Sequence, residues 1–318
     1  MRCMIMHCDS PWTGCAGAAL SVDYQGGDML KGRKLLSILL ALALAFALLG
    51  LAGCGSSSTT EKPKEEPAAA AGIKSVDDLK SGDKIGVQSG TTGEQWAKDN
   101  LAGKGIEVVP YDDILAAFSA LQAGDVVGVI NDLPISQDIV KDETRGLEVV
   151  QEIPTGETYG FSFNKDNTAL RDAVNYGLAE VIASGEYNKI YTQWFGAPPA
   201  SMPTATVEAA KPNSAPKTLT AGKIIVGSDT AFPPFENVEG AETVGFDVDL
   251  VKAIGQKIGL NVEFKTYKFD ALITGLQSGT EFDMVASAMT ITDERAKSVN
   301  FSNPYINSNQ SLTVQKAQ

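Results

Sequence analysis

The chain has 318 residues and a formal net charge of −13, with 4 cysteines and 1 histidine. All of these cysteines and the histidine lie at or before Cys54, and everything from Cys54 onward carries about −14, because four basic and three acidic residues precede it. A region without further cysteine or histidine lacks the usual ligands of zinc and the usual parts of Ser-His and Cys-His catalytic sites. Its acidic charge disfavours nucleic acid. We therefore expect no metal, no cofactor and no nucleic-acid partner, with carboxylate or lysine chemistry still open.

A secretion signal is predicted upstream of Cys54. The basic residues Lys31, Arg33 and Lys34 precede an apolar run over 35–52, which ends in small residues. This order of a basic region, an apolar region and a small-residue cleavage site is typical of secretory signals. Because the basic cluster follows Met29, we expect 1–28 to be a non-native leader and translation to start at Met29.

The cysteine after the signal predicts a lipid anchor. Leu51-Ala52-Gly53-Cys54 resembles the lipobox of bacterial lipoproteins, in which the cysteine is lipidated and becomes the mature N-terminus. The alternative is a plain transmembrane anchor, since roughly 18 apolar residues just span a bilayer. The polar stretch after Cys54 favours the lipoprotein, with 29–53 as signal peptide and 54–72 as a flexible tether.

Alternating strand and helix patterns then follow in chain order. The first group is a short helix at 75–80, a strand at 84–88, a turn opening a helix through Trp96, a strand at 106–111, a helix at 112–123, a strand at 126–131, a helix from Asp132, a strand at 159–163 and helices at 168–183 and 187–195. Residues 197–217, rich in Pro, Ala and Thr, are predicted to be a linker. The second group is a strand at 224–227, a helix at 247–258, a strand at 262–266, a helix at 269–276, a strand at 282–287, a short helix at 292–297 and a strand at 311–315. This order predicts two α/β units with mainly parallel sheets.

Polar and aromatic residues at the ends of these strands are candidates for a ligand site. The carboxyl ends of strands and the amino ends of helices present unpaired amides where two such units face each other. One arginine, two aspartates, aromatic rings and hydroxyl groups suit a zwitterion, because arginine binds a carboxylate through two hydrogen bonds. The candidate set is Gln88, Thr91, Thr92, Asp132, Asp229, Phe232, Phe269, Ser287, Ala288, Thr290 and Arg295.

Several ordered motifs resemble the polar amino-acid-binding proteins of ABC importers, the solute-binding protein family 3. Residues 227–236, 245–250, 289–295 and 301–305 resemble the first lobe of that family, residues 78–80, 85–92 and 131–134 its second lobe, and residues 159–196 its C-terminal return into the first lobe. The resemblance implies a two-lobed, type II periplasmic-binding-protein-like α/β fold. It also implies residue roles: Arg295 would bind the ligand carboxylate with amides near Thr290 and Thr92, Asp132 would bind the ammonium group, Phe232 and Phe269 would sandwich the side chain, and Asp229 would reach its far end.

Each of these residues also has a plainer interpretation. Asp132 and Asp229 can be helix N-caps, Arg295 can pair with Asp293 or Glu294 at the surface, and the phenylalanines can belong to the core.

The order of the lobes differs from that family. We expect 73–158 to form the second, small lobe, 159–196 the return, 197–217 the linker and 218–318 the first, large lobe. This order indicates a circular permutation with one covalent crossing between lobes, near 157–164. A tandem array, or a domain-swapped dimer, is the alternative.

Together these features predict a lipid-anchored protein on the outer face of the bacterial cell membrane, not an enzyme. It would bind glutamine, arginine, lysine or histidine and deliver it to the permease and ATPase subunits of an ABC transporter. The alternatives are a tethered amino-acid sensor and a dehydratase on the same fold.

Overall fold

The computed structural model describes residues 72–203, 209–212 and 216–317, all within one compact unit spanning 64–318. The predicted leader, signal peptide, lipidated Cys54 and nearly all of the tether lie outside the described residues, as does part of the predicted linker. Among the described residues, no helix has the length and apolar character needed to cross a membrane.

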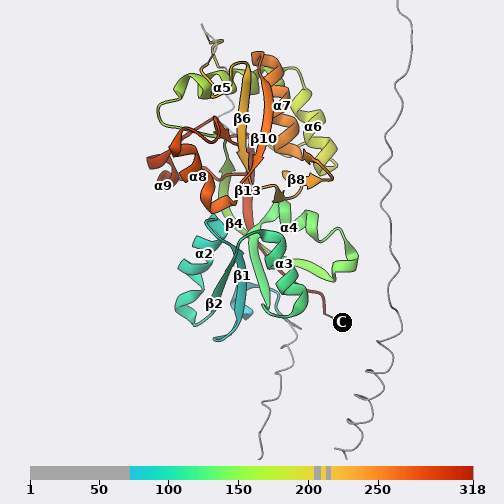
Figure 1. Cartoon of the computed structure of the whole chain (residues 1–318). Coiled ribbons are helices and arrows are strands. Elements are labelled where there is room, and N and C mark those ends of the chain that lie inside the picture. Colours follow the sequence, from blue (N-terminus) through green and yellow to red (C-terminus); the bar gives the residue numbers. More distant parts are fainter. Residues whose placement is uncertain (1–71, 204–208, 213–215, 318) are drawn as a thin grey trace, which may run out of the picture. The chain divides into compact units, whose positions relative to one another are not determined.

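The small lobe is built on a five-stranded sheet (Figure 1). Its strand order is β2 (Glu107–Tyr111), β1 (Lys84–Gln88), β3 (Gly128–Asp132), β13 (Ile306–Gln315) and β4 (Leu147–Tyr159). β1 is parallel to β2 and β3, and β13 is antiparallel to β3 and β4. Its helices are α2 (Thr92–Asn100), α3 (Ile114–Ala123) and α4 (Leu133–Ile139), with short 3-10 helices at Val76–Asp78, Ala102–Lys104 and Glu143–Arg145.

Alternation along β3 explains why helices cover both faces of this sheet. Consecutive side chains of a strand point to opposite faces. Val129 belongs to the apolar cluster that contains Phe118 of α3, whereas the next residue, Ile130, packs with Ala97 and Leu101 from α2 and its C-terminal end. The helices α3 and α2 therefore cover opposite faces, which is the three-layer arrangement expected of an α/β unit.

The large lobe contains a second five-stranded sheet and a small three-stranded one. The large sheet has the order β10 (Asn261–Thr266), β6 (Lys223–Ser228), β11 (Met284–Val285), β5 (Ser162–Phe163) and β12 (Asn300–Phe301), and the small one is β7 (Ala231–Phe232), β8 (Glu236–Glu239) and β9 (Glu242–Val244). Its helices are α5 (Thr168–Ala183), α6 (Glu186–Phe195), α7 (Phe246–Ile258), α8 (Phe269–Ser278) and α9 (Asp293–Ser298).

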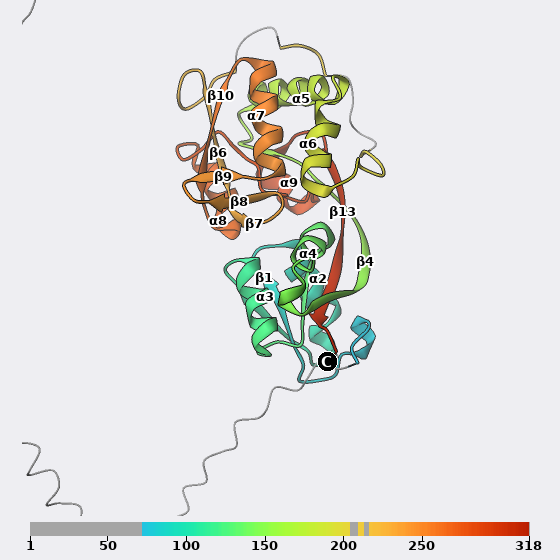
Figure 2. The ribbon, with the colours of Figure 1, turned by 90° about the vertical axis from the view of Figure 1, so that its right-hand side faces the viewer.

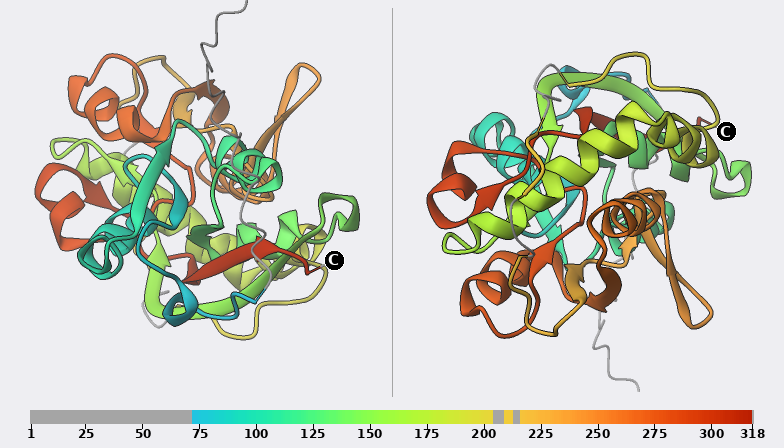
Figure 3. Two further views of the ribbon diagram at one scale, coloured as in Figure 1. Left: turned by 90° about the horizontal axis from the view of Figure 1, so that it is seen from below. Right: turned by 90° about the horizontal axis from the view of Figure 1, so that it is seen from above.

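Helices α5 and α7 pack closely although they are far apart in the sequence (Figure 3). The contact leaves no room for a side chain at Gly177, where a Cβ atom would lie 2.9 Å from Cγ2 and 3.1 Å from the carbonyl oxygen of Ile254. The segment before the linker therefore shares its core with the segment after it.

Both the fold class and one domain boundary can be compared with the sequence predictions. The mixed α/β class is confirmed. The boundary 218–318 is wrong for β13, which was expected only from Ser311 onward and in the large lobe. In the structure β13 begins at Ile306 and lies between β3 and β4 in the small-lobe sheet (Figure 2).

The prediction of one covalent crossing is also wrong. The chain passes between the lobes once from β4 to β5 and again from β12 to β13. β4 was not predicted at all, because it is an edge strand with a polar sequence and contains Pro154, which edge strands tolerate.

Candidate functional site

The predicted site residues meet where the strand ends of the two lobes face each other. Gln88 ends β1 and Asp132 ends β3 in the small lobe, while Asp229 follows β6 and Ser287 follows β11 in the large lobe. Parallel strands place their carboxyl ends at one edge of a sheet, so each lobe contributes one polar edge. The edges are in direct contact: Nε2 of Gln88 donates to Oδ2 of Asp229 at 2.5 Å.

Arg295 also takes part in this contact between the lobes. Thr292 caps α9 by accepting from the Arg295 N–H. The guanidinium donates from Nη1 to the main-chain oxygen of Thr290 in its own lobe and from Nη2 to the main-chain oxygen of Gly90 in the small lobe, both at 2.9 Å. It also lies 5.3 Å from the ring centroid of Phe269, a cation–π distance.

The surface ion pair considered for Arg295 is not formed. Glu294 pairs with Lys297 instead. Burial lowers the pKa of the Arg295 guanidinium, whereas the charges of Asp132 and Glu157 favour its protonated form. Since a guanidinium has five N–H donors and the hydrogen bonds to Thr290 and Gly90 use two of them, Arg295 retains donors for a carboxylate.

Asp132 is buried and accepts hydrogen bonds on both oxygens. Oδ1 accepts from Nε2 of Gln310 at 2.5 Å, and Oδ2 accepts from the Tyr159 hydroxyl. Although Asp132 stands at the N-cap position of α4, its side chain makes no capping bond, so the plainer interpretation as an N-cap does not hold. Burial, and secondarily the charge of Glu157, raises the pKa of Asp132 to about 7.

Glu157 is a third carboxylate at this place, and sequence reasoning missed it. One oxygen accepts from Thr92 at 2.8 Å and from Thr290 at 2.6 Å, which joins the two lobes. The other accepts from Thr155 and from Gln310, both at 2.9 Å. The usable signal was its position in the predicted crossing segment, because a polar residue at a crossing faces both lobes.

Asp229 lies at the other end of the contact. Its N–H donates to Oγ of Ser287 at 3.0 Å, and no helix follows it, so it is not an N-cap. Burial raises its pKa to about 6, and its bond from Gln88 and the charge of Lys268 act against that rise. Lys268 itself pairs across the lobes with Asp113 at 3.2 Å.

Two predicted residues, Thr91 and Ala288, have structural roles of their own. Thr91 is the N-cap of α2. Its hydroxyl donates to the main-chain oxygen of Gln88 and accepts from the Glu94 N–H. Ala288 adopts a left-handed φ of 43° and donates its N–H to Asp247.

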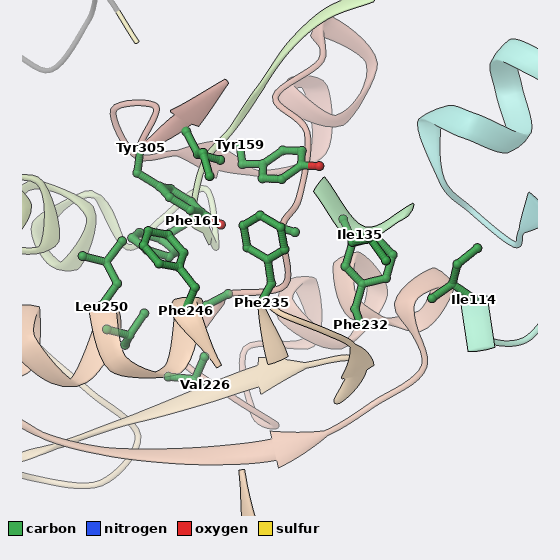
Figure 4. Packing of buried hydrophobic residues seen from close by; sticks show 14 of the residues in the cluster. Ile114, Ile135, Tyr159, Phe161, Val226, Phe232, Phe235, Phe246, Leu250 and Tyr305 are labelled. Carbon is green, nitrogen blue, oxygen red and sulfur yellow. The ribbon is translucent and has the colours of Figure 1, made fainter. Parts of the chain in front are cut away.

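Phe232, in contrast to the half-buried Phe269, is buried in an apolar cluster shared by both lobes, beside Ile135 and near Ile114 (Figure 4). The interpretation of Phe232 as a core residue therefore describes its present packing.

Comparisons with known proteins agree with this architecture. The family model of bacterial extracellular solute-binding proteins, family 3, matches residues 29–197 and 224–318. The arginine-binding extracellular protein ArtP of Bacillus subtilis is 43% identical over 94 residues, which are 30% of this chain and 36% of the relative. The L-cystine-binding protein TcyJ of Escherichia coli K12 is 34% identical over 125 residues, 39% of this chain and 46% of the relative.

A solved structure of an ancestral arginine-binding protein bound to arginine is 50% identical over 27% of this chain and 38% of its own, with a TM-score of 0.26. In these matches the chain spans less than half the length of each relative. The family model, in contrast, matches most of the chain in two segments. The chain therefore belongs to the bacterial extracellular solute-binding proteins, family 3.

Proposed function

We propose that the protein binds a free amino acid between its two lobes. The observation that carries this proposal is Arg295, a guanidinium placed between the lobes with unused donors and with Asp132 and Glu157 close enough to influence its pKa. A cation beside a pair of carboxylates suits the carboxylate and ammonium of a zwitterion. The amides near Thr290 and Thr92 would add donors to the carboxylate, and Asp132 would accept from the ammonium group.

The other end of the site favours a polar or basic side chain. Asp229 is buried, and Gln88 beside it has a buried Oε1 without a partner in the described structure. Two acceptors side by side suit a side chain that donates hydrogen bonds, such as guanidinium, ammonium or amide. Phe269 and, after local rearrangement, Phe232 would pack against its aliphatic part. Glutamine, arginine, lysine and histidine are the candidates.

Delivery to an ABC transporter is the proposed role of binding. Family membership and relatives named for arginine and cystine binding support it. We further propose that Cys54 carries the lipid that holds the protein at the outer face of the cell membrane, and that permease and ATPase subunits are its partners. Mass spectrometry of the mature N-terminus tests the first point, because a Cys54→Ala variant should lose the acyl mass.

The lobe order supports the proposal of a circular permutation. Ile73, near the start of the described residues, and Val314, near their end, pack into the same small-lobe apolar cluster. The two ends therefore lie in one lobe, where a continuous chain could join them in an unpermuted relative. A domain-swapped dimer is distinguished from a monomer by light scattering of the purified protein.

A thermal-shift screen of the twenty amino acids tests the binding proposal. A ligand that binds only the folded state raises the melting temperature, and about a hundredfold excess over Kd adds about 2.7 kcal/mol to stability. A polar or basic amino acid should give the largest shift. No shift with any amino acid would contradict the proposal.

Glu157 is the single observation in favour of an enzyme. A dehydratase needs a general acid, and Glu157 is a carboxylate beyond the two assigned to the ligand. Its oxygens already accept four hydrogen bonds, from Thr92, Thr155, Thr290 and Gln310, which supports a joining role instead. Turnover of prephenate or arogenate, abolished in a Glu157→Gln variant, would support the enzyme.

A further inference from the structure

Two buried carboxyl groups, which bond the candidate-site residues Ser287 and Ala288, have no positively charged partner in the described part of the chain. Glu236 of β8 and Asp247 in the first turn of α7 are both fully buried. None of the ion pairs in the described part of the chain includes either side chain. Two buried negative charges without a cation are costly, so such groups normally retain a proton.

Each of these carboxyl groups has one bonded oxygen and one oxygen without a partner. Oε1 of Glu236 accepts from Oγ of Ser287 at 2.7 Å. Oδ2 of Asp247 accepts from the Ala288 N–H at 2.9 Å and from the Tyr305 hydroxyl at 2.7 Å. Oε2 of Glu236 and Oδ1 of Asp247 are buried and have no hydrogen-bond partner in the described structure.

The segments that carry the two unbonded oxygens are in backbone contact. The Asp247 N–H donates at 3.0 Å to the main-chain oxygen of Phe235, the residue directly before Glu236 in the chain. A Cβ atom at Gly245 would lie 2.8 Å from Cα of Glu236, so the backbones are in contact there. The bonded oxygens reach consecutive residues, Ser287 and Ala288. The residues directly before Glu236 and Asp247 in the chain, Phe235 and Phe246, pack their rings 5.9 Å apart, and the ring of Tyr305 stacks on that of Phe246 (Figure 4).

We propose that Glu236 and Asp247 share one proton, with the Glu236 carboxyl donating to the Asp247 carboxylate, and that this pair positions the segment 287–290 for ligand recognition. The proton satisfies both unbonded oxygens with one hydrogen bond. Asp247 is the anion of the pair because its other oxygen already accepts from two donors. The consequence for ligand recognition rests on the proposed function, whereas the shared proton does not.

Electrostatics agree with this assignment. Burial and the charge of Asp247 raise the pKa of Glu236 well above its ordinary value, and burial raises that of Asp247 to about 7. The other titratable groups that face the pair are Asp229, which also raises the pKa of Glu236, and the hydroxyls of Tyr305 and Tyr187, whose own pKa values are raised mainly by burial and further by the charge of Asp247. The pair therefore holds a proton at neutral pH.

The positioning role follows from what the pair bonds. The Ser287 hydroxyl, which donates to Glu236, also accepts a hydrogen bond from the N–H of Asp229. Ser287 therefore links the pair to the backbone of Asp229. Ala288 has a left-handed φ of 43°, which a non-glycine residue adopts at a cost, and its bond to Asp247 stabilises that conformation. Thr290, two residues on, accepts from Arg295. Glu236 and Asp247 are thus positioning residues behind the groups that would touch the ligand.

The test of the shared proton is the pH dependence of unfolding of the full-length chain, measured by denaturant titration without ligand between about pH 7 and about pH 9. Glu236→Gln keeps a donor for Asp247 and an acceptor for Ser287 but cannot lose a proton. Relative to this variant, the unfolding equilibrium constant of the wild type should rise about tenfold per pH unit, because its folded state retains one proton that the unfolded state has released. The exposed Glu239 of the same strand gives the control, and Glu239→Gln should keep the wild-type slope.

Equal pH dependence of the unfolding equilibrium constant in the wild type and in Glu236→Gln would overturn the shared proton. Two ionised carboxylates bridged by water or a cation would give this result. If Glu236→Gln fails to fold, the infrared spectrum of the wild type decides: a protonated-carboxyl band at about pH 8 supports the proposal, and its absence overturns it.

Amide hydrogen exchange at Asp229 and Ala288 tests the positioning role. Glu236→Ala should accelerate it about tenfold or more, while Glu236→Gln stays near the wild type. Unchanged exchange in Glu236→Ala would overturn positioning. A failure to bind any amino acid would count against the proposed function and leave these results standing.

Discussion

Arg295 donates from Nη2 to the main-chain oxygen of Gly90 at 2.9 Å, a direct hydrogen bond from the large lobe to the small lobe. The same guanidinium bonds Thr290 within its own lobe. Removing it therefore removes both the proposed carboxylate site and a contact between lobes.

Arg295→Ala should lower the affinity for the bound amino acid by about 30-fold to several thousandfold, since losing one partner of a hydrogen-bonded pair of charges between the lobes costs about 2–5 kcal/mol. Titration calorimetry measures the change. Arg171→Ala is the matched control, because Arg171 lies on α5 and pairs only with the neighbouring Asp172. Unchanged affinity in Arg295→Ala would refute the proposed clamp.

We expect the proposed contact between Asp132 and the ligand ammonium group to make binding depend on pH. The pKa of Asp132 is raised to about 7, so its protonated form is well populated at about pH 6 and accepts poorly from an ammonium group. Affinity for L-arginine should rise between about pH 6 and pH 8, and Asp132→Asn should bind weakly with a flatter profile. Calorimetry across this range checks it, and a profile that Asp132→Asn leaves unaltered would be evidence against this role.

The stability of the ligand-free protein has the opposite pH dependence. Folding raises the pKa of Asp132 from 3.8 to about 7, so the folded state holds a proton that the unfolded state has lost between these values. This group's contribution to stability therefore falls as pH rises through that window. Denaturant titrations should show a shallower decline in Asp132→Asn, and an identical decline would contradict the raised pKa.

Gln88 links the lobes at the proposed side-chain end of the site. Gln88→Leu removes the Oε1 acceptor that is proposed to receive a donor of the ligand side chain, at a cost of about 1–3 kcal/mol, so affinity for L-arginine should fall roughly 5- to 150-fold. The exposed Gln256 of α7 provides the control, and Gln256→Leu should bind normally. If both variants bind alike, Gln88 contributes nothing to recognition.

Gly177 tests the packing of the segment before the linker against the segment after it. Gly177→Val places atoms against Ile254, where even a Cβ atom would be only 2.9 Å away, and overpacking typically costs about 1–3 kcal/mol. Thermal unfolding should show a lower melting temperature. Gly103→Val has open space around it and should change stability little. A neutral Gly177→Val would mean that α5 and α7 separate without cost.

Strands made mainly of apolar residues could be predicted from the sequence, whereas strands that bury polar side chains could not. β1, β3 and β6 are short apolar runs bounded by turns, so periodicity identified them. β13 lies between two other strands of its sheet yet buries Ser308, Gln310 and Thr313. Because these residues are polar, the sequence pattern indicated neither the full length of the strand nor the lobe to which it belongs. The three-stranded β7–β9 sheet was also missed, because its strands are only two to four residues long.

The same limit explains which site residues were missed. The rule that ligands meet strand ends led to Gln88, Asp132 and Asp229, and the structure brings the first and last into direct contact. Glu157 and Gln310 lie inside β4 and β13, the long strands that run between lobes, and therefore escaped that rule. Only the tertiary contact of these two strands places them beside Asp132.

The most direct test of the central claim compares one amino acid with the amine that remains when its α-carboxyl group is removed. For the amino acid with the largest thermal shift, titration calorimetry of the wild type should give an affinity at least about a hundredfold above that of its amine, because only the amino acid offers Arg295 a carboxylate. Equal affinities, or binding of neither compound, would contradict the claim that an amino acid is held by Arg295 between the lobes.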